Sequence, residues 1–381
     1  PQVAEKHLYP IRETGILKQL ILFLACAGTN QVPVIVPADS KLEVTDPLFD
    51  TPVPERAVMA VMTSGTTGNG KLLFRTFESW YGYFETQNRI FGISGESRLF
   101  AQGSLAFTGN LNLYMGQLAA GGTLIAEDVF LPGKWEQVMA RERANGIYLI
   151  PSKLLMLPRV FKGVNADIRT IISGSQSLGR KDAEVLKKIF PNTEITLYYG
   201  ASELNYITYV KSADMTEERN LIGKPFPGVR VFIQDDEMYV DNAFHVENIT
   251  VPYSLKDSGR MDLQGNFYFL GRTDDIVGVR GRKVSMMKIE NALEEVAGIT
   301  EAAVVLLPKE KDADMPAEIV SAFVTVEGTD VPENLRQQLK EKLADFEIPK
   351  RVIVLEAFPK NTSGKVDKAR LKKMWIEQEP Q

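Results

Sequence analysis

Residues 63–71 combine hydroxyl side chains, glycines and a lysine directly after an apolar segment, residues 57–62. Glycine lets backbone N–H groups approach an oxyanion closely, hydroxyls add hydrogen-bond donors, and lysine adds positive charge. A flexible surface loop is the alternative, but six consecutive Ser, Thr and Gly residues after a buried strand favour a phosphate-binding loop. The candidate phosphate-binding residues are Thr63, Ser64, Gly65, Thr66, Thr67, Gly68 and Lys71.

Part of this loop also satisfies the P-loop pattern of nucleotide hydrolases and kinases. Gly65, Gly70 and Lys71 have the required spacing, but the pattern next needs Ser or Thr to hold Mg²⁺, and the residue here is Leu72. A P-loop kinase or ATPase is therefore disfavoured without being excluded. The order of the glycines does not fit the dinucleotide-binding motif, and no G-x-S-x-G elbow supports a serine hydrolase.

Composition limits the partners. The 381 residues include 44 Lys+Arg and 49 Asp+Glu, and the net charge of −5 argues against nucleic-acid binding. The chain has one cysteine, Cys26, and two histidines, His7 and His245, so a metal would bind carboxylates, as Mg²⁺ does. A single cysteine fits a reducing cytoplasm. The longest apolar run, residues 20–27, is too short to span a membrane, and residues 1–12 show no signal-peptide pattern.

The elements that must position the loop alternate between short apolar strands and helices. This alternation predicts an α/β fold with mostly parallel sheets in a large N-terminal body. In the first helix we expect Leu17, Leu20, Leu24 and Ala27 to lie on one face. The predicted strands are 34–36, 57–62, 147–150, 169–173 and 194–199, and the predicted helices are 14–28, 78–90, 135–142 and 180–189.

The C-terminal part has a different pattern, which predicts a small α+β domain. Its predicted strands are 275–280, 302–307, 319–326 and 352–355, and its predicted helices are 286–297 and one that begins at Pro332. A unit of this size is typical of a separate domain. We therefore predict a large domain over residues 1–272 and a small C-terminal domain over residues 273–381.

Residues 63–71 resemble the phosphate loop of the adenylate-forming superfamily, which includes acyl-CoA synthetases, peptide-synthetase adenylation domains and firefly luciferase. Further matches follow in the superfamily's order, so that the resemblance extends from residue 15 to residue 375, and the pattern is most similar to AMP-dependent acyl-CoA synthetases. The turn 174–176 resembles the adenine-binding turn, and residues 199–203 resemble the family's Tyr-Gly-x-Thr-Glu motif. The residues matched are Gly174, Ser175, Gln176, Tyr199, Gly200, Ser202 and Glu203.

The resemblance implies a role for each of these residues. The aromatic ring of Tyr199 stacks on adenine, the hydroxyl of Ser202 contacts the α-phosphate in place of the usual threonine, and Glu203 binds Mg²⁺. In the later motifs, Asp257 grips the ribose hydroxyls, with Arg272 near the ribose. Three further matches lie in the predicted C-terminal domain: Asp274 as hinge, Gly281 on the loop of the thiol channel and Lys365 as the catalytic lysine of adenylation.

By this resemblance the chain is an AMP-forming acid–thiol ligase that uses ATP, Mg²⁺ and coenzyme A. It converts a carboxylic acid to acyl-AMP with release of pyrophosphate, and then transfers the acyl group to coenzyme A, while its small domain rotates between the two steps. The alternative acceptor is the phosphopantetheine of a carrier protein. The sequence leaves the acid open, because aryl, short and long acyl chains all remain compatible with it.

Several residues depart from the family pattern. Gly70 replaces the usual proline of the phosphate loop, and Met286 and Lys288 replace a proline and a glutamate. Thr108, at the acyl pocket, stands where many acyl-CoA synthetases carry histidine and amino-acid adenylating domains carry aspartate, which argues against an amino-acid substrate. Only 62 residues precede the loop, fewer than usual. These departures keep a degenerate, non-catalytic nucleotide-binding protein as a third hypothesis.

Overall fold

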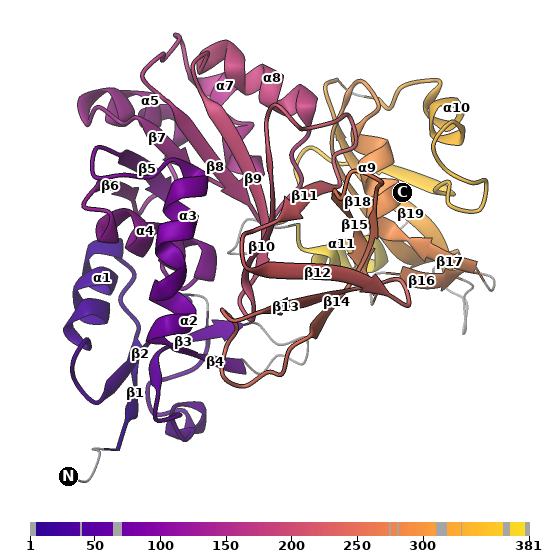
Figure 1. The fold of residues 1–381 in the computed structure, drawn as a ribbon. Coiled ribbons are helices and arrows are strands. Elements are labelled where there is room, and N and C mark those ends of the chain that lie inside the picture. The colour runs from indigo at the N-terminus through magenta and orange to yellow at the C-terminus, as the bar shows by residue number, and fades with distance from the viewer. Residues whose placement is uncertain are drawn as a thin grey trace. The chain divides into compact units, whose positions relative to one another are not determined.

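The computed structural model describes residues 5–38, 40–63, 71–273, 276–279, 282–309, 318–328, 330–360 and 366–377 (Figure 1). The chain divides into two compact units. The first contains Pro1–Phe232, Tyr239–Leu255 and Met261–Phe267, and the second contains Ile233–Met238, Lys256–Arg260 and Tyr268–Gln381. The predicted domain boundary between residues 272 and 273 stays a prediction.

A four-stranded sheet in the first unit carries the candidate phosphate loop. Its order is β1 (His7–Ile11), β2 (Gln31–Ile35), β3 (Ala57–Thr63) and β4 (Lys71–Thr76). Strands β1, β2 and β3 are parallel, and β3 and β4 are antiparallel with Thr63 opposite Lys71. The hairpin therefore brings the two ends of residues 64–70 together, while those residues themselves lie outside the described part of the chain.

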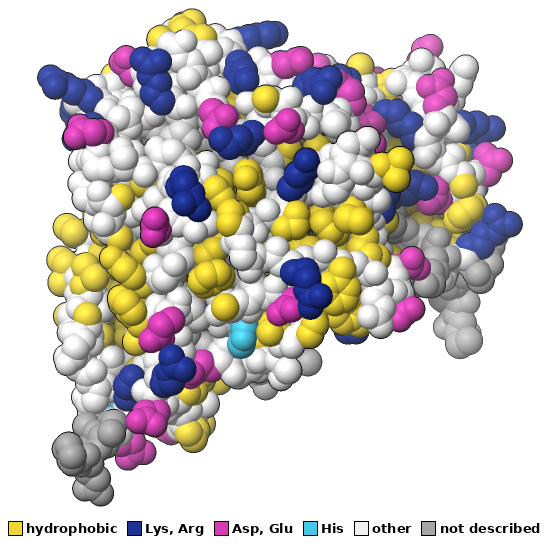
Figure 2. Space-filling model, viewed as in Figure 1, with side chains coloured by type: hydrophobic (Ala, Val, Ile, Leu, Met, Phe, Trp, Pro, Cys, Tyr) yellow, Lys and Arg dark blue, Asp and Glu magenta, His cyan; other side chains and the backbone are white. Residues whose placement is uncertain are grey.

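Helix α1 (Ile16–Ala25) connects β1 and β2, and only part of the predicted apolar face is buried. Ile16, Leu20 and Phe23 are buried, whereas Leu17 is 69% exposed and Leu24 is 48% exposed. The helix is apolar on nearly every side, so spacing alone does not select the face that packs on the sheet. The exposed apolar residues contribute to the hydrophobic surface in the region of α1 (Figure 2).

The large sheet contains the parallel core that the sequence predicts. Its strands in the first unit follow the order β11-β10-β9-β8-β7-β5-β6. Strands β6, β5, β7, β8 and β9 are parallel, and β10 is antiparallel to its neighbours β9 and β11. The bounds are β5 (Arg98–Gln102), β6 (Thr123–Glu127), β7 (Gly146–Tyr148), β8 (Thr170–Gly174), β9 (Glu194–Ala201), β10 (Asn205–Lys211) and β11 (Leu221–Pro225).

Helices connect these strands. Because the strands are parallel, their carboxyl ends lie at the same edge of the sheet, where α/β proteins bind ligands. The predicted helix 78–90 is interrupted by a 3₁₀ turn, η2 (Tyr81–Tyr83). Helices α3 and α4 pack together, as do α7 and α8 (Figure 1). The helical segments are η1 (Pro47–Asp50), α2 (Phe77–Trp80), α3 (Phe84–Phe91), α4 (Thr108–Ala119), α5 (Pro132–Arg141), α6 (Pro151–Leu154), α7 (Leu157–Val160) and α8 (Arg180–Ile189).

Four further strands divide their residues between the two units. They neighbour one another in the order β12 (Val229–Gln234), β13 (Glu237–Asn242), β14 (Tyr253–Met261) and β15 (Phe267–Arg272).

The rest of the second unit is the α+β arrangement expected from the sequence. Strands β16 (Ile276–Val279) and β17 (Arg282–Ser285) form a hairpin. Strand β19 (Glu318–Val326) lies antiparallel to β18 (Ile299–Pro308) and parallel to β20 (Arg351–Val354). Helix α9 (Met286–Glu294) packs on β18, and its Ile289 and Leu293 share a core with Val304 and Val324. The other helices are α10 (Leu335–Lys340) and α11 (Lys368–Glu377).

Among the described residues, none of the helices has the length and apolar character needed to cross a bilayer.

Candidate active site

The motif at residues 199–203 forms the end of β9 and the turn into β10. A Cβ on Gly200 would lie 2.5 Å from the backbone oxygen of Asn205, closer than real Cβ atoms come, so the turn requires glycine. Asn205 itself has a φ of +65°, in the left-handed region that asparagine tolerates. The turn leaves Ser202 and Glu203 half-buried at the carboxyl edge of the sheet, and the carbonyl oxygen of Glu203 accepts a hydrogen bond from the backbone N–H of Val246 at 2.9 Å.

Ser202 contacts the predicted acyl-pocket residue directly. Its Oγ lies 2.8 Å from Oγ1 of Thr108, the first residue of α4. The contact joins residues 94 positions apart in the sequence. The fold thus places the hydroxyl expected at the α-phosphate beside the residue expected at the acid.

Arg75 supports the same turn, and no motif in the sequence pointed to it. The side chain is buried on β4, and its Nη2 donates to the carbonyl oxygen of Ser202 at 2.7 Å. Nη1 donates to the carbonyl oxygens of Phe244 at 2.8 Å and Ser79 at 3.3 Å. A buried guanidinium needs such acceptors because it has lost its water. The only hint in the sequence was an arginine within a mostly apolar strand.

Charge links Arg75 to Glu203. Burial lowers the pKa of Arg75 to about 10, and the nearby Glu203 carboxylate acts in the opposite direction. Burial also raises the pKa of Tyr253, and the charge of Glu203 adds to that shift. Glu203 is therefore a carboxylate that interacts with both a buried cation and a tyrosine hydroxyl.

Glu203 could bind a magnesium ion only as a single carboxylate ligand. Among the described residues, no group of three or more His, Cys, Asp and Glu side chains is arranged to hold a metal. Mg²⁺ commonly takes one or two carboxylates and completes its shell with water and substrate phosphate oxygens. A half-buried Glu203 beside residues expected to bind phosphate is compatible with that mode, and not with an all-protein metal cage.

The predicted adenine turn lies at the carboxyl end of β8. Ser175 has a φ of +70°, and the Oε1 of Gln176 accepts a hydrogen bond from the backbone N–H of Ser152, at the start of α6, at 2.9 Å. A Cβ on Gly174 would lie 2.5 Å from the ring of Tyr198. The turn is thus held by α6 and by close packing against β9, whose next residue is Tyr199 of the motif.

The two predicted ribose residues come together within the second unit. Asp257 on β14 is buried, and its Oδ1 lies 3.6 Å from the Nε of the more exposed Arg272 on β15. Their proximity agrees with a shared ligand, and their roles stay predictions. The predicted site residues that lie outside the described part of the chain are Ser64, Gly65, Thr66, Thr67, Gly68, Asp274, Gly281 and Lys365.

The two substituted positions at the start of α9 have structural partners. Met286 is buried, and the Nζ of Lys288 lies 2.7 Å from Oε2 of the buried Glu347. Lys360 and Val366 pair as an antiparallel bridge, so the ends of the segment that carries Lys365 lie side by side.

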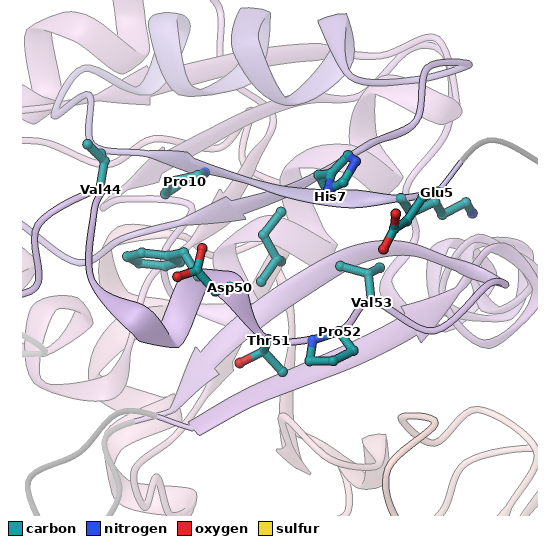
Figure 3. Close-up of a pocket in the computed structure, with 11 residues that line it drawn as sticks. Glu5, His7, Pro10, Val44, Asp50, Thr51, Pro52 and Val53 are labelled. Atoms are coloured by element: carbon teal, nitrogen blue, oxygen red, sulfur yellow. The ribbon is translucent and has the colours of Figure 1, made fainter.

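A separate pocket of about 410 Å³ lies beside β1 and the segment before β3 (Figure 3). His7 and Pro10 line it from β1, and Asp50, Thr51 and Val53 line it from the other side. None of its lining residues belongs to the predicted site.

The structure is thus an α/β protein in which a parallel sheet carries the motif turn at its carboxyl edge and an α+β part follows in the chain. Residues 17–243 match the AMP-binding enzyme family, and residues 288–365 match the AMP-binding enzyme C-terminal domain. Since the first match spans more than half of the chain, this protein belongs to the AMP-binding enzyme family, which is the adenylate-forming superfamily.

Individual relatives agree with this assignment. The uncharacterized acyl-CoA ligase YhfT of Bacillus subtilis is 26% identical over 400 residues, which cover 99% of this chain and 81% of the relative. A linear gramicidin synthase of Brevibacillus parabrevis is 26% identical over 347 residues, covering 82% of this chain and 7% of the synthase. The structure of O-succinylbenzoate coenzyme A synthetase from Bacillus subtilis, in complex with ATP and magnesium, superposes with a TM-score of 0.80 at 19% identity, covering 97% of this chain and 90% of that one.

Proposed function

We propose that this protein is an AMP-forming acid–thiol ligase that makes an acyl-CoA from a carboxylic acid, ATP and coenzyme A. The observation that carries the proposal is the turn at Ser202. The hydroxyl of Ser202 forms a hydrogen bond with the hydroxyl of Thr108, and its carbonyl oxygen accepts a hydrogen bond from Arg75. Family membership and the acyl-CoA ligase among the relatives support it. The single cysteine supports a cytoplasmic location, where thiols stay reduced.

In the first step the carboxylate oxygen attacks the α-phosphorus of ATP, and the bond to the bridging oxygen of pyrophosphate breaks. Two anions approach each other, so the site must supply donors and positive charge. Ser202 donates its hydroxyl to an α-phosphate oxygen, Lys365 brings positive charge, and residues 63–71 hold the departing phosphates. Mg²⁺, when bound by Glu203, neutralises phosphate charge.

In the second step the sulfur of coenzyme A attacks the carbonyl carbon of acyl-AMP. The thiol loses its proton to solvent, the bond from that carbon to the AMP oxygen breaks, and AMP leaves. A rotation at Asp274 would remove Lys365 and bring the Gly281 loop to the site, because both cannot occupy it together.

A carrier protein is the alternative acceptor, and one observation favours keeping it: the gramicidin synthase among the relatives has the same identity to this chain as the acyl-CoA ligase. The phosphopantetheine thiol would attack the same carbon, so the adenylation step is common to both proposals.

The test is to incubate the protein with ATP, Mg²⁺ and single acids, and to identify the nucleotide product. AMP and pyrophosphate, formed only with an acid, support the proposal, whereas ADP and phosphate would indicate a kinase or ATPase. Binding of ATP without turnover of any acid would indicate the non-catalytic alternative. Mass spectrometry of coenzyme A and of a phosphopantetheinylated carrier protein, each offered alone, then identifies the acceptor.

A further inference from the structure

The first turn of α4 is in direct contact with two buried tyrosine hydroxyls. Gly109 follows Thr108, and a Cβ on Gly109 would lie 2.6 Å from the Oη of Tyr198 and 2.7 Å from the Oη of Tyr148. Real Cβ atoms essentially never come within 3.0 Å of another atom in this way. A side chain at position 109 would therefore clash with both hydroxyls unless they shifted, so the two hydroxyls lie close to the backbone of Gly109.

A second glycine accommodates the ring of Tyr198 at the end of β8. A Cβ on Gly174 would lie 2.5 to 2.8 Å from three carbons of that ring. Tyr198 thus fills the space between the start of α4 and the carboxyl end of β8. It also packs edge-on against Tyr206, with ring centroids 4.9 Å apart.

The three rings form one buried group, which we call the tyrosine wall: Tyr148, Tyr198 and Tyr206. Their exposed fractions are 4%, 6% and 2%, and the hydroxyls of Tyr148 and Tyr198 lie 3.1 Å apart. Burial raises the pKa of Tyr198 to about 12, so its hydroxyl stays protonated at neutral pH. The tyrosine wall is therefore uncharged and closely packed. Two of its hydroxyls lie beside Gly109, the residue that follows Thr108.

The proposed reaction places the acid's carboxylate near the α-phosphate, and hence near the hydroxyl of Ser202. Thr108 lies 2.8 Å from that hydroxyl, and Gly109, the next residue, lies against the hydroxyls of Tyr148 and Tyr198. We infer that the substrate is a short aliphatic carboxylic acid, such as acetate, propionate or butyrate, and that the tyrosine wall excludes long-chain and aryl acids. This inference rests on the proposed function, and it names the substrate class of the same site.

Interior packing gives the inference its force. Protein interiors are close-packed, so inserting even a few methylenes into a filled region is unfavourable. A hydrophobic pocket discriminates one methylene by about 10- to 200-fold in kcat/KM. A chain several methylenes longer than butyrate should therefore be used very poorly unless the wall is opened.

The experiment measures pyrophosphate release by the whole protein with acetate, butyrate, octanoate, palmitate and benzoate. For the unaltered protein we expect kcat/KM to be at least about 100-fold higher for the best short acid than for octanoate, palmitate or benzoate. Tyr198→Ala should shift the preference by about tenfold or more toward octanoate. The matched control is Tyr83→Ala, because Tyr83 is similarly buried in the same core and contacts Tyr206, but it is not among the atoms nearest to a Cβ on Gly109 or Gly174.

A milder pair covers the case in which an alanine variant does not fold. Tyr198→Phe removes only the hydroxyl that faces Gly109 and should raise the relative rate with acids slightly longer than the best one, whereas Tyr83→Phe should leave the profile unchanged. Equal use of palmitate and acetate by the unaltered protein, or identical profiles in the two phenylalanine variants, would overturn the inference alone. Failure of every acid to release pyrophosphate would overturn the proposed function and the inference with it.

Discussion

The Nη2 of Arg75 donates a hydrogen bond to the backbone carbonyl oxygen of Ser202 at 2.7 Å, across 127 positions of sequence. Arg75 stands on β4, the strand that begins directly after the candidate phosphate loop, and Ser202 belongs to the motif turn after β9. One buried guanidinium thus joins the hairpin that flanks the phosphate loop to the turn that carries Glu203. This contact helps to fix the position of the motif turn relative to strand β4.

Replacing Arg75 should disturb both parts. Arg75→Met leaves the carbonyl oxygens of Ser202 and Phe244 buried without their donor, at a cost of about 1–3 kcal/mol each. We expect a lower midpoint of urea unfolding and a fall of about 100-fold in pyrophosphate release. Arg75→Lys keeps the charge but not the planar fork, so it should recover only part of the activity.

The control for this prediction is Arg230→Met. Arg230 is exposed, and the contacts described for it are an ion pair with Asp241 and a cation–π contact with the ring of Phe232. Its activity should match that of the unaltered protein. A folded Arg75→Met variant with normal dependence on Mg²⁺ and ATP would show that the turn does not need the guanidinium.

Thr108→Val tests the hydroxyl contact at the other side of the turn. The substitution keeps the shape of the side chain but removes the partner of Ser202 Oγ, which lies 2.8 Å away. We expect a loss of stability of about 1 kcal/mol and a fall in kcat for pyrophosphate release, since the Ser202 hydroxyl is no longer oriented. Thr108→Ser retains the hydroxyl and should retain the rate; equal rates in the valine and serine variants would contradict a positioning role.

The sequence predicted the elements that depend on local pattern. Strand β8 and helix α8 appear at or within one residue of their predicted bounds, because a continuous apolar run and a clear amphipathic spacing leave little choice. The sequence did not indicate which face of α1 is buried, because its residues are apolar on nearly every side. Arg75 escaped prediction for another reason: its acceptors, Ser202 and Phe244, are 127 and 169 residues away, and only the tertiary fold brings them to the strand.

Motif residues were found more easily than residues whose role is in packing. Gly109 belongs to no motif in the sequence, Gly174 was singled out only as part of the adenine turn, and neither has a left-handed φ that would mark it. Their significance is that tyrosine side chains from β7 and β9 occupy the room that a Cβ would fill. Such complementarity is a property of packing, which no local pattern records.

The Gly281 loop is expected to act only in the thiol step. Gly281→Leu should still release pyrophosphate and accumulate acyl-AMP, but form little thioester, because a bulky side chain obstructs the thiol channel. Gly278→Leu is the matched control, since a Cβ on the exposed Gly278 of β16 would meet no atom within 4 Å. Chromatography of the acyl-AMP and acyl-CoA formed in a single turnover separates the two steps, and normal thioester formation by Gly281→Leu would remove that loop from the site.

The last prediction concerns Lys365, the proposed source of positive charge in adenylation. Lys365→Ala should slow acyl-AMP formation by about 100-fold or more, because negative charge at the α-phosphorus loses its counterpart. Transfer from pre-made acyl-AMP to coenzyme A should stay close to the normal rate, since AMP is already a good leaving group. Lys360→Ala supplies the control: Lys360 is a nearby lysine whose Nζ pairs with Glu301 at 2.6 Å, and its loss should leave both steps unchanged. Rapid-quench measurement of each half-reaction decides the matter, and equal losses in both for Lys365→Ala would assign the lysine to general stability or substrate binding in place of adenylation.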